Sequence, residues 1–374
     1  MHPGGHVSRR IERASKTALA RAISPLLSKK RIAAGELARM RIRRLLVIRQ
    51  HNQMGDMLLA VPALRGLRKR FAEARITLVA APINADVCRR NPYVDEVLVY
   101  AKEENRRRPL GLLRFVAELR RRRFDAVIVL STVSFSVTSM LLAAASGSRV
   151  RIGSTSSPFG HDLSSRFYHL ELPLPRAEEL ARMHESAHNL YPLSAIGVEE
   201  SDLTSALVPR ADEELDCERF IAASFGDGGR FIVVHPGAGK RANAWPAVRF
   251  AEVATALHER FGLGVVAVRG PVDTAALDAF LGACGTHPVA ISCPPVGFLG
   301  ALIRRSALTL CNDTGIMHVA GAVGSRCVAV FGPTDPARWK PVNETVVAVK
   351  GIDGNVESVE VEEVLAAAVG LLGD

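Results

Sequence analysis

The sequence predicts an α/β protein of two successive units, each built on a mostly parallel sheet covered by helices. Short β-branched segments alternate with helix-like stretches from Arg44 onward, and the same alternation restarts near Phe231. In addition, each half opens with a strand, a loop containing glycine and a helix. The 374 residues, of which 48% are hydrophobic, suffice for two buried cores.

The first unit is expected at residues 41–205. Its strands are predicted at short apolar segments, namely residues 45–49, 76–80, 96–100 and 126–130. Helices are predicted at residues 57–71, 110–123 and 178–191. Pro62 should bend the first helix near its start, because proline has no backbone N–H to donate. A connector is expected at residues 194–209.

The second unit is expected at residues 206–374. Its predicted strands are residues 231–234, 264–268, 289–292, 307–310 and 327–331. A helix is expected at residues 247–261, just after Trp245-Pro246, where the proline suits a first helical turn. Open sheets bind ligands at the carboxyl ends of their strands, so we expect the two units to face one another across a cleft.

The net charge of +10 is concentrated in a basic extension before the first strand. Residues 1–44 contain twelve Lys or Arg and two Glu, so the remaining body is formally neutral. The extension, taken as residues 1–40 in the domain division, has no aromatic residue, and nucleic acid is therefore not an expected partner. Basic residues beside leucine and isoleucine favour contact of residues 9–44 with an anionic membrane surface, a disordered tail or a cleaved transit sequence.

No apolar segment approaches the roughly 18 residues that a membrane span needs. Six cysteines are scattered without a Cys-x-x-Cys pair, and several lie in strand-like apolar segments. This pattern predicts reduced cysteines in a cytoplasmic protein and no structural zinc.

A polar segment follows the predicted strand at 307–310 and continues into a helix. Asp313 or Thr314 is placed to cap that helix, Gly315 leaves room for a ligand near the backbone, and His318 lies one turn below Thr314. Helix N-termini bind anions. The segment therefore predicts either a simple helix cap or an anion-binding site.

Two further loops have the same strand-to-helix setting. Gly55-Asp56 follows the first strand, so Asp56 is either a helix-start carboxylate or a group that takes a proton from a hydroxyl nucleophile. The loop after residues 231–234 contains His235, Gly237, Gly239, Lys240 and Arg241, whose glycines allow close backbone approach and whose cations suit a diphosphate.

Asp273, after the strand at 264–268, is either a turn carboxylate or an acceptor for ribose hydroxyl groups. The chain contains no Asp-x-Asp pair, so no metal site is expected. The backbone N–H groups and the cations of the loop after residues 231–234 and of the segment at Asp313 would instead offset the charge of a leaving diphosphate. His235, at the end of an apolar strand, is also readily explained as a structural histidine.

Together these motifs resemble glycosyltransferase family 9, the lipopolysaccharide heptosyltransferases, in segments spread from about Arg44 to the C-terminal helix. The matching segments are Met54-Gly55-Asp56 with Pro62, His235-Pro236-Gly237-Ala238-Gly239 with Trp245-Pro246, Asn312-Asp313-Thr314-Gly315 with His318, and Gly332-Pro333-Thr334. The resemblance implies a GT-B fold, in which two Rossmann-like domains face an interdomain cleft. It implies an ADP-activated sugar donor on the second half and a lipid-linked glycan acceptor on the first.

Carried over by position, the resemblance makes Asp56 the general base of an inverting, metal-independent transfer. It makes Asp313, Thr314, Gly315 and His318 donor contacts, and Asp273 an acidic nucleoside contact. The family usually places a lysine two residues before the Trp-Pro pair, where this chain has Asn243, and Lys240 or Arg241 would have to replace it. The implied location is the cytoplasm, peripheral on the inner face of the bacterial inner membrane.

Two alternatives remain open at the level of sequence. A nucleotide-sugar epimerase of the same architecture would share the donor pocket and would form product without an acceptor. The Asn243 departure also permits a non-catalytic relative that binds the nucleotide sugar. No cofactor is expected in any of these cases, because the nucleotide sugar is a substrate.

Overall fold

The computed structural model describes residues 21–22, 30–50 and 53–373. The chain divides into two compact units. Unit 1 contains the described residues up to 50 together with residues 62–89 and 93–201, and unit 2 contains residues 53–61, 90–92 and 202 onward. The short segment that carries Asp56 thus belongs to unit 2, although the sequence division had placed it in the first domain.

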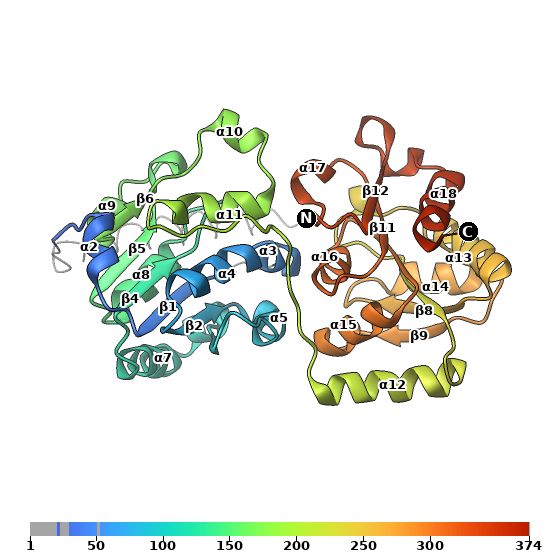
Figure 1. Cartoon of the computed structure of the whole chain (residues 1–374), viewed down its shortest axis with the longest axis horizontal. Helices are drawn as coiled ribbons and strands as arrows, with labels where there is room; N and C mark the ends of the chain where they lie inside the picture. The colour runs from blue at the N-terminus through green and yellow to red at the C-terminus, as the bar shows by residue number, and fades with distance from the viewer. Residues whose placement is uncertain (1–20, 23–29, 51–52, 374) are drawn as a thin grey trace. The chain divides into compact units, whose positions relative to one another are not determined.

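Unit 1 is a six-stranded parallel sheet in the order β3-β2-β1-β4-β5-β6 (Figure 1). Its strands are β1 (Arg44–Arg49), β2 (Arg75–Ala80), β3 (Glu96–Val99), β4 (Ala126–Val129), β5 (Val150–Ser154) and β6 (Leu170–Leu172). The helices that accompany them are α2 (Ala34–Arg39), α4 (Val61–Arg70), η2 (Pro82–Asn84), α5 (Ala85–Arg89), α6 (Lys102–Arg107), α7 (Pro109–Arg121), α8 (Val137–Ala145), η3 (Ser157–Phe159), α9 (Ser164–Phe167), α10 (Ala177–Ala181) and α11 (Glu185–Ser194).

Unit 2 is a second six-stranded parallel sheet, in the order β12-β11-β10-β7-β8-β9. Its strands are β7 (Phe231–His235), β8 (Gly264–Arg269), β9 (Val289–Ser292), β10 (Leu308–Asn312), β11 (Cys327–Phe331) and β12 (Val346–Lys350). Its helices are α3 (Met54–Leu58), α12 (Ala211–Phe225), η4 (Arg241–Asn243), α13 (Ala247–Phe261), α14 (Thr274–Ala283), α15 (Val296–Arg305), α16 (Gly315–Ala322), α17 (Pro336–Trp339), η5 (Ile352–Gly354), η6 (Val356–Ser358) and α18 (Val361–Leu372).

The two parallel sheets confirm the predicted α/β class, and all nine predicted strands are present. Two helix predictions were wrong. The helix expected at 57–71 is split into α3 and α4, and the one expected at 178–191 is split into α10 and α11. Asp56 therefore lies in the first turn of a separate five-residue helix rather than at the start of a long one.

The basic extension is described only in part, since residues 1–20 and 23–29 lie outside the described residues. Its last portion packs on unit 1, where Leu37 of α2 is buried and the Ile32 N–H donates to the His169 carbonyl at 3.0 Å. Arg31 forms an exposed ion pair with Glu171 at 2.9 Å. No helix in the described part of the chain is long and apolar enough to cross a membrane.

A buried polar network fixes the carboxyl end of β1. The Arg49 side chain is fully buried, and its Nη1 donates to Asn189 Oδ1 of α11 at 2.9 Å. Thr132, after β4, donates its hydroxyl to the same oxygen at 3.0 Å. A buried charge needs such partners, because leaving it unpaired costs several kcal/mol, roughly 3–5 on removal of one partner. The network thus fixes the carboxyl end of β1, the strand that precedes α3 in the chain.

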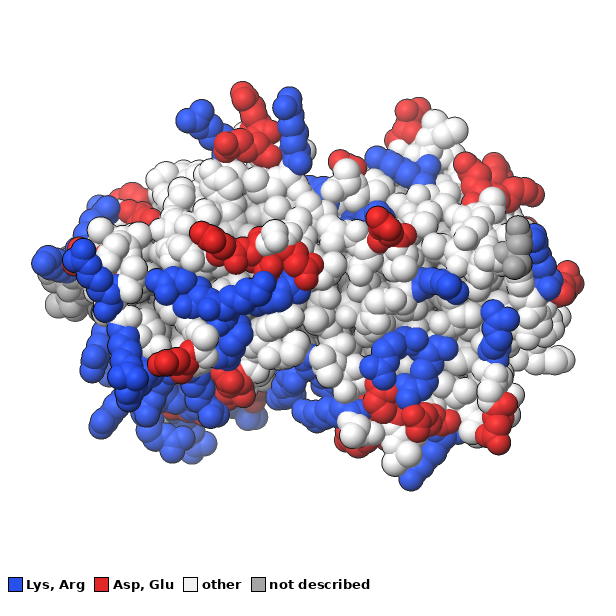
Figure 2. All heavy atoms as spheres, viewed as in Figure 1, with Lys and Arg blue, Asp and Glu red and all other residues white. Residues whose placement is uncertain are grey.

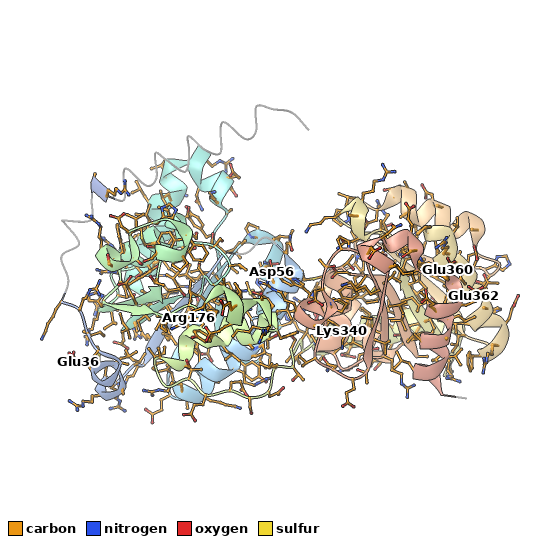
Figure 3. All side chains as sticks on the ribbon, turned by 90° about the horizontal axis from the view of Figure 1, so that it is seen from above. Glu36, Asp56, Arg176, Lys340, Glu360 and Glu362 are labelled. Carbon is orange, nitrogen blue, oxygen red and sulfur yellow. The ribbon has the colours of Figure 1, made fainter. Side chains whose placement is uncertain are left out.

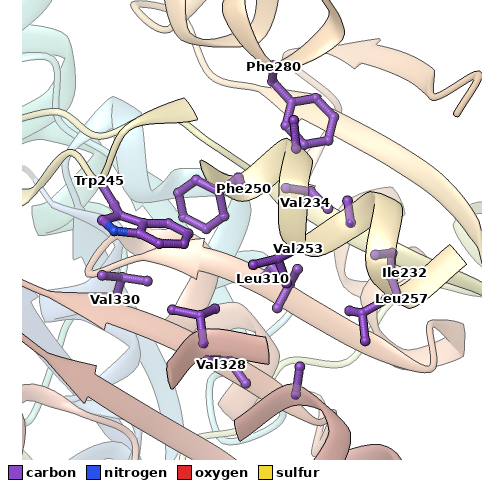
Figure 4. Packing of buried hydrophobic residues seen from close by; sticks show 14 of the residues in the cluster. Ile232, Val234, Trp245, Phe250, Val253, Leu257, Phe280, Leu310, Val328 and Val330 are labelled. Carbon is purple, nitrogen blue, oxygen red and sulfur yellow. The ribbon is translucent and has the colours of Figure 1, made fainter. Parts of the chain in front are cut away.

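In unit 2 one face of the sheet packs on α13, α14 and α18. Phe250 of α13 is fully buried there, and its ring meets the Trp245 indole edge to face at a centroid distance of 4.8 Å (Figure 4). The Trp245 Nε1–H donates to the Val359 carbonyl at 2.9 Å, so the indole has both an apolar contact and a polar partner. This core holds the loop after β7 against the C-terminal segment.

We predict that Phe250→Ala lowers the free energy of unfolding by about 3–5 kcal/mol, because it removes a buried ring and leaves a cavity beneath Trp245. Urea unfolding followed by tryptophan fluorescence measures this loss. Val248→Ala on the same helix is the matched control, because Val248 is 44% exposed and its truncation should cost less than about 1 kcal/mol. Equal losses in the two variants would contradict the assigned packing.

Candidate functional site

Asn312, at the carboxyl end of β10, joins the two central loops of unit 2. Its side chain is fully buried, and its Nδ2 donates to the carbonyl oxygens of Pro236 at 3.1 Å and Gly237 at 3.0 Å. Its Oδ1 accepts from the Trp245 backbone N–H at 2.9 Å. Because β7 and β10 are neighbouring parallel strands, one amide group fixes the loop after β7 to the end of β10.

Asp313 follows directly and is held by side chains from two other loops. Its Oδ2 accepts from Asn243 Nδ2 at 3.0 Å and from the Thr334 hydroxyl. Burial raises the pKa of the Asp313 carboxyl above its ordinary value, while the Thr334 hydrogen bond and the nearby charge of Lys240 act in the opposite direction. The carboxylate thus joins the loops that follow β7, β10 and β11.

Thr314 is the N-cap residue of α16, but its side chain forms no capping hydrogen bond in the described chain. Its Oγ1 is buried and has no hydrogen-bond partner among the described residues. Asp313 bonds to Asn243 and Thr334 instead. The geometry does not support the simple-cap interpretation, since neither side chain supplies the cap. Thr314 Oγ1 is therefore an unsatisfied buried hydroxyl at a helix N-terminus.

Helix α3 lies against α16 through a glycine on each side. A Cβ added at Gly55 would lie 2.5 Å from His318 Cδ2 and 2.8 Å from its Nε2, so only glycine leaves room for the imidazole. A Cβ at Gly315 would lie 2.5 Å from Met54 Cε. Asp56 follows Gly55 and is partly exposed (Figure 3). Asp56 is thus carried on a helix that packs directly on the N-terminal half of α16.

His235 and Asp273 form a second polar pair at the ends of β7 and β8. His235 Nε2 lies 3.2 Å from Asp273 Oδ2, and the two side chains are 7% and 9% exposed. The hydrogen bond from His235 holds the pKa of the Asp273 carboxyl below its ordinary value, and the Gly270 N–H also donates to it, at 3.1 Å. A Cβ at Gly237 would collide with the Asp273 side chain, so this glycine lets the pair fit beneath the loop.

The remaining predicted residues of this loop point to solvent. Gly239, Lys240 and Arg241 are exposed, and Lys240 is close enough to Asp313 to influence its titration. Arg241 begins the short helix η4, which ends at the buried Asn243. Asn243, which stands where the resemblance implies a lysine, thus donates its side-chain amide to Asp313.

Three positioning residues were not among the predicted site residues, namely Asn243, Asn312 and Thr334. Each lies in a motif that the sequence had singled out, but their partners are distant in the chain. For Asn312 the available signal was a polar residue at the end of an apolar strand. Asn243 and Thr334 lie farther from their strands, and no comparable signal in the sequence marked them. No group of three or more His, Cys, Asp or Glu residues that could hold a metal ion occurs in the described part of the chain, and metal independence stays a prediction.

Residues 112–367 match glycosyltransferase family 9 (heptosyltransferase). Lipopolysaccharide heptosyltransferase 3 from Escherichia coli is 28% identical over 305 residues, which cover 78% of this chain and 85% of that protein.

Solved structures share the fold. The glycosyl transferase family 9 protein from Veillonella parvula DSM 2008 superimposes with a TM-score of 0.79 at 24% identity, covering 90% of this chain and 99% of its own. The E. coli ADP-heptose lps heptosyltransferase II gives a TM-score of 0.71 at 24% identity, over 88% of this chain and 98% of its own. With the two parallel sheets, these likenesses confirm the predicted GT-B fold class. The family match covers more than half of the sequence, and the chain therefore belongs to glycosyltransferase family 9 and is a glycosyltransferase.

Proposed function

We propose that this enzyme transfers a heptose from ADP-heptose to a lipopolysaccharide-core or other lipid-linked glycan acceptor, with inversion and without a metal ion. The observation that carries the proposal is that Asp56 lies on α3, which packs against the N-terminal half of α16, the helix whose N-cap Thr314 has a buried hydroxyl with no partner among the described residues. The similarity to lipopolysaccharide heptosyltransferase 3 over 85% of its length supports the choice of sugar and acceptor class.

The donor diphosphate is proposed to lie at the N-terminus of α16. The first N–H groups of this helix, the Thr314 hydroxyl and the backbone at Gly315 would face the phosphate oxygens, and a helix N-terminus carries a partial positive charge. Lys240 adds a full positive charge from the loop after β7, and Arg241 is the second cation of that loop. Together these groups would offset the charge that develops on the leaving diphosphate.

The ordering of the loops supports this assignment. Asn312 fixes the loop after β7 to the end of β10, and Asn243 and Thr334 fix Asp313. Such pre-organised groups need little rearrangement during the reaction, which is the condition for electrostatic stabilisation of a transition state. The pair of His235 and Asp273 would support the loop after β7. His235 faces Asp273 Oδ2, so the nucleoside contact proposed for Asp273 uses its other oxygen, Oδ1.

Asp56 is proposed as the general base. It would take the proton of the acceptor hydroxyl as that oxygen attacks the anomeric carbon, while the bond to the diphosphate breaks on the opposite face and the diphosphate leaves with the bonding electrons. The acceptor is proposed to bind to unit 1 and the enzyme to work in the cytoplasm at the inner face of the bacterial inner membrane. Contact of the basic residues 9–44 with anionic lipid would support that location.

We predict that Asp56→Asn lowers the turnover of ADP-heptose with a lipid-linked core acceptor by at least about two orders of magnitude, because the amide cannot accept the proton. ADP binding measured by calorimetry should stay near wild type. Glu73→Gln, a surface carboxylate 80% exposed in its side chain, is the matched control and should leave turnover unchanged. Near-normal turnover of Asp56→Asn would remove Asp56 from the mechanism, and transfer from UDP- or GDP-sugars in preference to ADP-heptose would contradict the donor assignment.

We predict that Asn243→Asp weakens ADP binding by about tenfold or more, since it places a second carboxylate beside Asp313 and near the diphosphate. Asn243→Ala removes the hydrogen bond without adding charge and should weaken binding less. Calorimetry at low and high salt separates the two effects, because added salt screens only the charge repulsion. Equal affinities in wild type and Asn243→Asp would show that the diphosphate lies elsewhere.

A further inference from the structure

The outer face of α7 in unit 1 carries exposed leucines. Phe115 and Leu119, one turn apart, pack into the core of unit 1. Leu110 and Leu113 lie on the opposite side of the helix and are 69% and 64% exposed, and Leu112 is 37% exposed. A helix at a protein surface normally turns polar side chains outward. The folding of unit 1 does not account for leucines at these positions.

These leucines lie at the carboxyl edge of the sheet of unit 1. The Phe115 ring is 5.1 Å from the ring of Tyr100, which follows β3, whereas Arg122, just after α7, pairs with Glu96 at the start of β3. The helix therefore runs antiparallel to β3, with its first turn near the end of that strand. Two further exposed aliphatic residues follow strands of the same sheet at this edge, namely Ile83 after β2 and Val133 after β4.

Positive charge surrounds the leucines. Of the basic residues on α6 and α7 and between them whose side chains are described, Lys102, Arg108, Arg114, Arg120 and Arg121 are exposed, against two exposed carboxylates, Glu103 and Glu104. Neither Arg114 nor Arg121 forms an ion pair within the described part of the chain. Figure 2 shows Lys and Arg side chains gathered over the part of unit 1 where Figure 1 draws α7.

We propose that the outer face of α7 docks on an anionic phospholipid surface. Leu110 and Leu113 would enter the boundary between headgroups and acyl chains, and Arg114 and Arg121 would lie against lipid phosphates. Charge decides this choice of partner. A second copy of the chain would bring the arginines of two helices together, whereas a bilayer with anionic lipid offers the opposite charge and an apolar layer beneath it.

The surface is distinct from the basic extension and from the site at α16. It belongs to described residues of unit 1, and it requires no sugar transfer in order to bind lipid. Loss of membrane docking would lower transfer to an acceptor held in a membrane but would leave nucleotide binding unchanged, whereas failure of the proposed transfer would leave docking unchanged.

The first test is cosedimentation of the full chain with phosphatidylcholine vesicles that contain or lack phosphatidylglycerol. Wild type should bind only the anionic vesicles, and salt should release it. The double variant Leu110→Ser/Leu113→Ser should bind about tenfold more weakly, through lost apolar burial. Leu215→Ser on α12 is the matched control, because Leu215 is also exposed, at 46%, and should bind like wild type. Absence of wild-type binding, or equal binding of the double variant, would overturn the proposal.

The second test locates the contact by amide hydrogen exchange. Anionic vesicles should slow exchange in residues 110–114, which separates docking by α7 from binding by the extension alone. Exchange that slows only in residues 1–44 would overturn the proposal. Sedimentation velocity without lipid tests whether a second copy of the chain binds this face instead. A wild-type dimer that becomes monomeric in Leu110→Ser/Leu113→Ser would assign the face to self-association and would also overturn the proposal.

Discussion

The close contact of α3 with α16 is the constraint on which the proposed chemistry depends. Gly55 leaves room for the His318 imidazole, and Gly315 lies against Met54, so a side chain at position 55 would displace the imidazole and one at position 315 would displace the end of the Met54 side chain. Through this contact the segment that carries Asp56 belongs to the unit that holds the predicted donor loops. A carboxylate and a helix N-terminus are thereby placed in one compact unit, although some 260 residues separate them in the chain.

Around this contact, buried amide groups arrange the loops. Asn312 uses three hydrogen bonds to join the ends of β7 and β10. Asn243 bonds to Asp313 at the position where the sequence resemblance implies a lysine. With asparagine at position 243, the site lacks the positive charge of a lysine side chain and has a hydrogen bond to Asp313 in its place. The remaining positive charge then comes from Lys240, the helix N-terminus and the loop backbone, so the diphosphate would be held more by oriented dipoles than by a dedicated cation.

The sequence predicted the fold class because parallel strands in a doubly covered sheet are continuous apolar segments that periodicity reveals. It missed β5, β6 and β12. Two of these are short or interrupted by Arg151, Gly153 and Glu171, but β12 is a continuous β-branched segment that the pattern could have revealed. The junction at Asn312-Asp313-Thr314 was found because polar residues follow an apolar strand. The partners of Asn312 and Asp313 were not, since those in the loop after β7 lie 67 to 76 residues away, Thr334 lies 21 residues away, and all depend on strand order. The interruption between α3 and α4 falls at residues 59–60, just before Pro62, where the sequence predicted a bend but not two separate helices.

The most direct measurement of the central claim is a double-mutant cycle on transfer rate between Gly55→Ala and His318→Ala. A methyl group at position 55 would collide with the imidazole and displace Asp56, and removal of the imidazole should relieve part of that effect. The account predicts a coupling of at least about 1 kcal/mol, with the double variant faster than the product of the two single losses. Strictly additive losses would contradict it, because they would mean that α3 and α16 do not act as one contact.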